Sequence, residues 1–329
     1  MASFNQTPSA VSAVQSGSFD KLTREAFASA LSRTADKVFQ RVYDAEKQGM
    51  NLIREGMQPG SRNTATFQSW RLDGGLVPQN RDGDNMASGS GADGFSYTSR
   101  VYTYRKNMAY ERELYEQDDR GIVSARTEDL SRSGTLTIEN IIADIYNRGV
   151  DPATAPILAD DGLALVDSGR PSPNPAGGTW SNLETASAVT TDSVFTAWLN
   201  ARLTKADDGA VYPRRIKAVV CRPNEAKAVW EVRNSAYRPT DALNVNNLFK
   251  EWKEATFDVM VYDYLTTANI YYLLADPKSM DNELQLMWAA KPSFETWGDN
   301  PDVVNLRIRF RVGAALGCPK KFIRGGAVV

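Results

Sequence analysis

The sequence predicts an α+β fold on three observations: two long helical patterns, two alternating strand patterns around a glycine-rich segment, and a later series of short helices and strands. From Asp20 to about Glu55, apolar residues recur at three- and four-residue steps, which predicts an amphipathic helix ending near Gly56. Residues 1–18 are rich in Ser, Ala and Gln and lack a pattern that could bury surface, so we expect a mobile arm.

The next segment, about residues 61–110, predicts two antiparallel strands joined by a long polar tip. TATFQSWRL reads as a strand and the aromatic run from Phe95 to Tyr104 alternates as one, on either side of DGGLVPQNRDGDNMASGSGADG. A two-stranded ribbon has too little area to bury its own aromatic side chains, so it should lie against another surface. That surface need not belong to the same chain.

A second helix is predicted from about residue 118 to residue 148. Asp118 and Asp119 suit its N-terminus, and Gly149 ends it. At 1.5 Å per residue, a helix of roughly 30 residues spans about 45 Å, which is longer than a compact domain of this mass needs. We interpret this helix as a strut.

After a Pro- and Gly-rich connection over residues 150–180, the pattern becomes mixed. Two final strands, ELQLMWAA and VVNLRIRFRV, are expected on either side of a break at KPSFETWGDNPD. The other predicted elements are helices at about 192–205 and 224–235 and strands at 216–221, 257–265 and 270–276.

Composition excludes several kinds of chemistry. The chain has no histidine, which excludes Ser-His-Asp and Cys-His nucleophiles and histidine-ligated metals. Cys221 and Cys318 are the only cysteines and form no CxxC pair, so we expect two buried thiols in a reducing compartment. With 38 Lys plus Arg against 40 Asp plus Glu, the net charge of −2 offers little basis for electrostatic DNA binding.

Two motifs suggest chemistry but have simpler explanations. GSGADG matches GxGxxG, yet a strand pattern follows it where a nucleotide site needs a helix, so we interpret it as loop composition. Four acidic pairs have the ligand type for a divalent cation or for acid/base catalysis, but none has EF-hand spacing. We expect solvated turns or caps at these pairs, and no catalytic residue, metal or cofactor. The pairs are Asp82/Asp84, Asp118/Asp119, Asp160/Asp161 and Asp207/Asp208.

The last predicted strand carries arginine on one face. Apolar residues alternate there with Arg307, Arg309 and Arg311, so the apolar face belongs to the core. Adjacent arginines repel one another without counter-charges, which makes them candidate contacts for acidic residues of a neighbour or for phosphate. A merely solvated face is the alternative.

Several segments, by their order and spacing, resemble the major capsid proteins of tailed phages with the HK97-like fold. Together they cover most of residues 60–326. The segments are ERELYEQDD, DGLALVDSGRPSPNPAGGTWSNL, KAVVCRPNEAKAVWEVRNSAYRPTDALNVNNL, VMVYDYLTTANIYYLLADP and LQLMWAAKPSFETWGDNPDVVNLRIRFRVG.

The resemblance implies an HK97-like capsid fold in four parts. They are an N-terminal arm at 1–57, an extended two-stranded E-loop at 58–115, a peripheral domain with a long spine helix and C-terminal strands at 116–150 and 281–329, and an axial α/β domain at 151–280. It also implies that the E-loop lies over an adjacent subunit, without a lysine cross-link, because residues 60–105 contain no Lys. The expected contact residues are Trp70, Leu76, Phe95, Tyr97, Tyr102 and Arg105, with Arg307, Arg309 and Arg311 as charged candidates.

The implied function is structural. Hexamers and pentamers of the chain would form an icosahedral virion head, assembled in the host cytoplasm and touching packaged double-stranded DNA non-specifically. Portal, scaffold and decoration proteins are the further expected partners, and no membrane is expected. The alternatives are an encapsulin-type shell that stores cargo, a phage tail structural protein, and a histidine-independent hydrolase that uses the acidic pairs.

Overall fold

The computed structural model describes residues 24–57, 63–70, 93–111, 121–173, 178–184, 189–237, 246–252, 255–268, 270–278, 282–297, 303–321 and 323–327. These residues form a mixture of helices and sheets, which confirms the predicted α+β class. The predicted mobile arm at residues 1–18, most of the polar tip and the Asp118/Asp119 helix start lie outside the described residues.

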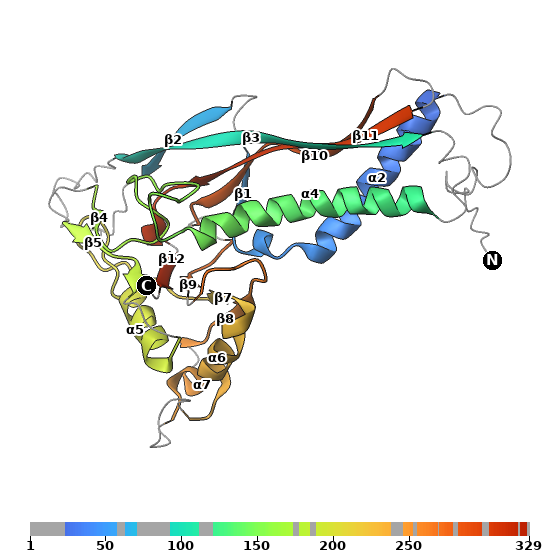
Figure 1. Ribbon diagram of the computed structural model, residues 1–329. Coiled ribbons are helices and arrows are strands. Elements are labelled where there is room, and N and C mark those ends of the chain that lie inside the picture. The colour runs from blue at the N-terminus through green and yellow to red at the C-terminus, as the bar shows by residue number, and fades with distance from the viewer. Residues whose placement is uncertain are drawn as a thin grey trace, which may run out of the picture. The chain divides into compact units, whose positions relative to one another are not determined.

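The chain divides into two compact units. Unit 1 contains Met1–Lys47, Thr103–Thr137 and Ala290–Arg311. Unit 2 contains Gln48–Tyr102, Ile138–Ala289 and Val312–Val329. Four long elements contribute residues to both units (Figure 1): helix α4 (Ile122–Asn147) and strands β3 (Asp93–Glu111), β10 (Leu284–Trp297) and β11 (Val303–Leu316).

Unit 1 packs helices α2 (Arg24–Glu46) and α4 against the apolar side of a sheet. Phe39 of α2 meets Phe294 of β10 edge to face, with ring centroids 5.9 Å apart. A Cβ at Gly134 of α4 would lie 2.5 Å from Cδ1 of Ile308, so the glycine allows helix and strand to approach closely. The alternation predicted for β11 is confirmed, because Ile308 and its apolar neighbours on that strand are buried.

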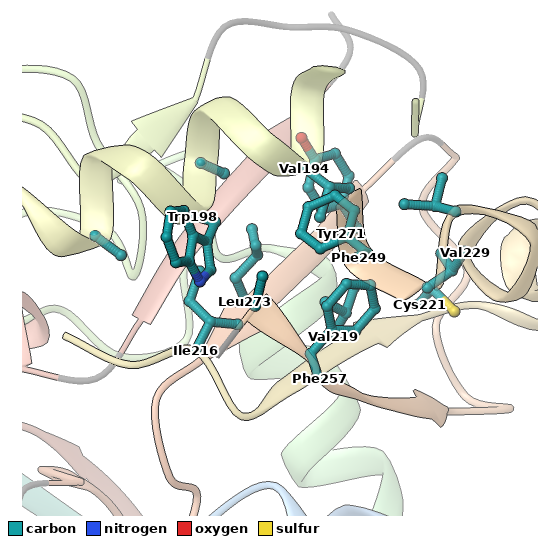
Figure 2. Packing of buried hydrophobic residues seen from close by; sticks show 14 residues of the cluster. Val194, Trp198, Ile216, Val219, Cys221, Val229, Phe249, Phe257, Tyr271 and Leu273 are labelled. Carbon is teal, nitrogen blue, oxygen red and sulfur yellow. The ribbon is translucent and has the colours of Figure 1, made fainter. Parts of the chain in front are cut away.

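Unit 2 contains a five-stranded sheet in the order β6-β12-β9-β7-β8. Helices α5 (Thr191–Arg202) and α6 (Pro223–Asn234) contribute Trp198 and Val229 to one cluster with Val219 and Leu273 of the sheet (Figure 2). All four residues of β7 are buried, which explains their continuous apolar pattern. The strands are β6 (Leu183–Glu184), β7 (Ala218–Cys221), β8 (Asp258–Val261), β9 (Ile270–Leu274) and β12 (Ile323–Ala327).

Local sequence fixes where α5 begins. The side chain of Thr190 accepts a hydrogen bond from the backbone N–H of Ser193, and the Ser193 hydroxyl accepts one from the backbone N–H of Thr190. This capping box satisfies two donors that the helix itself leaves unpaired. The short helix and strand patterns of the mixed region are confirmed to within a few residues, and both cysteines are free and buried as predicted.

Two predicted boundaries are wrong. The break at KPSFETWGDNPD begins too early, since β10 continues to Trp297. Strand β1 (Arg54–Met57) pairs with Gln285–Trp288 of β10, so Pro292 lies beyond the residues that pair with β1. The first helix was predicted to continue to about Glu55 but ends at Glu46, and Leu52 and Ile53 are buried just before β1.

A leucine pair tests the core of unit 2. Leu273→Ala should lower the free energy of unfolding by about 2–5 kcal/mol, because Leu273 is 1% exposed and its loss leaves a cavity. Leu203→Ala is the matched control, since Leu203 is 59% exposed, and it should change stability by less than about 0.5 kcal/mol. Denaturant unfolding measures both; equal losses would contradict the assigned core.

Candidate functional site

The predicted antiparallel ribbon is present. Strand β2 (Thr64–Trp70) pairs antiparallel with β3, and Phe67 lies opposite Tyr97. The two rings stack with centroids 5.5 Å apart. Burial raises the pKa of Tyr97 to about 12, and the carboxylates of Glu283 and Asp160 add to the effect. Tyr97 is therefore half-buried by its own chain.

The base of the ribbon also rests on its own chain. In the second five-stranded sheet, with the order β1-β10-β11-β3-β2, strand β3 lies between β11 and β2. A Cβ at Gly313 of β11 would collide with the backbone carbonyl of Arg100, so only glycine allows this approach. Val101 is buried here. The base of the ribbon is thus covered by its own chain.

The expected contact residues differ in how much of each side chain is exposed to solvent. Tyr102 is 54% exposed, Phe95 is half-buried, and Arg105 is exposed. The backbone of Trp70 pairs with Asp93, whereas the side chain of Trp70 and all of Leu76 lie outside the described residues. Of the ribbon's described aromatic residues, Tyr102 therefore offers the most surface to another molecule.

One acidic pair, predicted to be solvated, is instead buried beside the ribbon. Asp160 accepts a hydrogen bond from the Ser69 hydroxyl at 2.6 Å, and the same hydroxyl lies 2.9 Å from the carbonyl oxygen of Phe95. A hydroxyl has one proton, so it can donate to only one of these oxygens. Both contacts are satisfied when Asp160 itself is protonated and donates to Ser69.

The electrostatic surroundings of Asp160 favour that protonated form. Burial raises the pKa of Asp160 to about 6, and the neighbouring carboxylates of Asp161 and Glu283 raise it further. The hydrogen bond from Ser69 and the charge of Arg170 oppose this rise only in part. The side chain therefore changes charge near pH 6.

Asp208 is exposed and accepts a hydrogen bond from the backbone N–H of Ala210 at 3.0 Å, as predicted for a solvated turn, whereas Asp161 and Asp207 are buried in ion pairs. Asp161 forms a buried ion pair with Arg170 at 2.7 Å, and Asp207 forms one with Lys320 at 3.1 Å. Burial of these charged groups is tolerated because each one is paired with a group of opposite charge. Within the described part of the chain, no group of three or more Cys, Asp or Glu side chains is placed to hold a metal ion.

The arginines of β11 line a basic hollow in unit 1. The hollow has a volume of about 490 Å³ and is lined by Thr103, Arg105, Arg307 and Arg309. Glu295 of β10 lies 2.5 Å from Arg307 and 3.7 Å from Arg309. The hydrogen bond from Arg307 lowers the pKa of Glu295. The third predicted arginine, Arg311, is half-buried and does not line the hollow.

A further buried carboxylate was not predicted. Glu139 of α4 has no exposed surface and accepts hydrogen bonds from the backbone N–H groups of Gln48 (3.1 Å) and Gly49 (2.7 Å) and from the Tyr262 hydroxyl (3.1 Å). Burial raises the pKa of Glu139, and these three donors oppose the rise. The sequence offered one signal for this buried carboxylate: a glutamate stands among the apolar residues that form the buried stripe of α4.

Comparison with known proteins assigns this arrangement to a family. A profile described as phage capsid protein matches residues 96–325, more than half of the chain. The chain belongs to the phage capsid protein family. The predicted resemblance is confirmed, and the protein is a capsid shell protein. No curated protein matches this capsid protein. No helix in the described residues is long and apolar enough to cross a membrane.

Solved structures support an HK97-like fold for the capsid protein. "Capsid structure of the Cyanophage P-SCSP1u" is similar with a TM-score of 0.52 and 11% identity, covering 85% of this chain and 87% of that one. "Capsid of empty GTA particle computed with C5 symmetry" has a TM-score of 0.52 at 10% identity, covering 86% and 91%. "Microbacterium phage Oxtober96" has a TM-score of 0.50 at 12% identity, covering 85% and 90%.

The Ser69–Asp160 contact predicts a pH dependence. Because the folded pKa of Asp160 lies above its ordinary value of 3.8, the folded state holds this proton more tightly than the unfolded state. Its contribution to stability is complete below about pH 4 and is lost as the pH rises through about 6. Asp160→Asn mimics the protonated side chain and should remove this loss, which is on the order of 2–3 kcal/mol.

Denaturant unfolding of the wild type and the Asp160→Asn variant at a series of pH values measures the difference. Asp129→Asn is the control, because Asp129 is exposed on α4. The stabilities of wild type and Asp160→Asn should converge near pH 4 and separate towards pH 7. Parallel curves for the two proteins would show that Asp160 is not the group responsible.

Proposed function

We propose that this capsid protein assembles into hexamers and pentamers that close an icosahedral head around double-stranded DNA. The observation that carries the proposal is the family match over residues 96–325, on a chain that contains a two-stranded ribbon. The charge balance is compatible with the role. A net charge of −2 gives the shell little attraction for packaged DNA, which must both enter and leave.

In this proposal, the chain has the four parts implied by its resemblance. Residues 1–57 are the N-terminal arm, 58–115 the E-loop, 116–150 with 281–329 the peripheral domain, and 151–280 the axial domain. The subunit is a component of the virion capsid, and we propose that it is assembled in the host cytoplasm with portal, scaffold and decoration proteins as partners.

The ribbon supplies the proposed contact between copies. Large aromatic side chains contribute strongly to interfaces, and Tyr102 has more than half of its surface exposed in the single chain. We assign Phe95 and Arg105 to the same contact, because both keep exposed surface on β3. Trp70, Leu76 and Tyr97 complete the proposed set.

Particle formation tests the proposal. The purified chain, examined by light scattering and negative-stain microscopy over a range of salt concentrations, should form closed particles with hexameric and pentameric units. A species of 36.3 kDa under every condition would contradict it. Particles that enclose a cargo protein in place of DNA would indicate an encapsulin-type shell, and open rings or tubes a tail protein.

Shortening the ribbon tests the contact between copies. Replacing residues 73–91 by a short Gly/Ser linker should leave the subunit folded but prevent stable closure, because the segment removed would touch a neighbour. Circular dichroism measures folding, and light scattering measures the assembled fraction. A shortened protein that assembles and resists heat as the wild type does would refute this role for the ribbon.

A further inference from the structure

We propose that the basic hollow of unit 1 receives an acidic side chain from a second copy of this chain. The hollow is the space of about 490 Å³ lined by Thr103, Arg105, Arg307 and Arg309. This inference rests on the proposed function, since it supplies the chemistry of one contact in the assembled shell.

The charges within the hollow do not balance. Arg105, Arg307 and Arg309 bring three guanidinium groups together, and Glu295 is the one described carboxylate paired with them. Arg105 makes no ion pair with any residue that the structure describes. Two positive charges therefore face the hollow without a counter-charge among the described residues. Guanidinium groups this close repel one another, and an added anion would relieve that repulsion.

A donor atom in the hollow's lining is also unsatisfied. The Nε–H of Arg307 is buried and has no hydrogen-bond partner among the described residues, although a terminal nitrogen of the same guanidinium binds Glu295. The guanidinium lies 5.1 Å from the ring centroid of Trp297, which holds it over the ring. A buried donor without an acceptor is destabilising, so the single chain is incomplete here.

The geometry favours a carboxylate over phosphate. Glu295 already pairs with Arg307 and Arg309, so these guanidinium groups are placed to bind a carboxylate. Its negative charge opposes the approach of a phosphate, which carries more charge. Binding to DNA also requires several basic contacts along a backbone, whereas the whole chain has a net charge of −2.

The charge distribution favours a second copy of the chain as the source of this carboxylate. Since the chain as a whole is slightly negative while this hollow is positive, the remaining surface carries an excess of acidic groups. A positive hollow on one copy and an acidic side chain elsewhere on the next form a head-to-tail contact. Contacts of this kind close into rings and shells when the rotation between copies permits.

The test is the double variant Arg105→Gln/Arg309→Gln, which keeps the pair between Arg307 and Glu295. It should raise the protein concentration needed for half-maximal assembly by about tenfold or more, because charge pairs fix contacts between copies. Arg126→Gln is the matched control, since Arg126 is exposed outside the hollow, and it should assemble like the wild type. Light scattering at several NaCl concentrations measures assembly.

The outcomes separate this inference from the proposed function. If the wild type does not assemble, the proposed function fails; if wild type and double variant assemble equally, only this inference fails. Binding of a labelled DNA duplex by unassembled wild type, lost in a variant that assembles normally, would assign the hollow to phosphate and overturn it. Circular dichroism checks folding, and if the double variant is unfolded, Arg105→Gln alone decides in the same assay.

Discussion

A buried carboxylate, Glu139, anchors the segment that precedes strand β1. A fully buried carboxylate without partners would cost several kcal/mol, so the fold must bring donors to it. Two of these are the backbone N–H groups of Gln48 and Gly49, and the third is the hydroxyl of Tyr262. No side chain fits at position 49, because a Cβ would lie 2.7 Å from the carboxylate. The segment before β1 and the loop after β8 are therefore held on the same turn of α4.

In unit 1, the two faces of the long sheet differ in composition. In unit 1, apolar residues of β10 and β11 pack against α2 and α4, and this face is complete within the chain. The other side of the same strands carries Arg307, Arg309 and their partner Glu295. There the charges are unequal and one donor lacks an acceptor. In the assembly that we propose, the apolar face stabilises the subunit and the charged face contacts a neighbouring copy.

Periodicity explains what could be predicted from the sequence. The ribbon, the long helix and the alternation of β11 follow from local periods of two and about 3.6 residues, and the structure confirms them. The buried carboxylates could not be found in this way, since Glu139 meets Gln48, 91 positions earlier, and Asp160 meets Ser69, also 91 positions away. The continuation of β10 through Pro292 could not be found either, because a proline inside a strand pattern favours a break. The alternating arginines of β11 indicated a basic surface, but the sequence could not show that Arg105 of β3 lines the same hollow.

A cryo-microscopy map of the particles formed by the full-length chain tests the central claim, that this subunit completes its surfaces with identical copies. The account predicts density from an adjacent subunit over Tyr102 and an acidic side chain of another copy within reach of Arg105 and Arg309. A map in which Tyr102 and these arginines remain exposed to solvent in every subunit would contradict it.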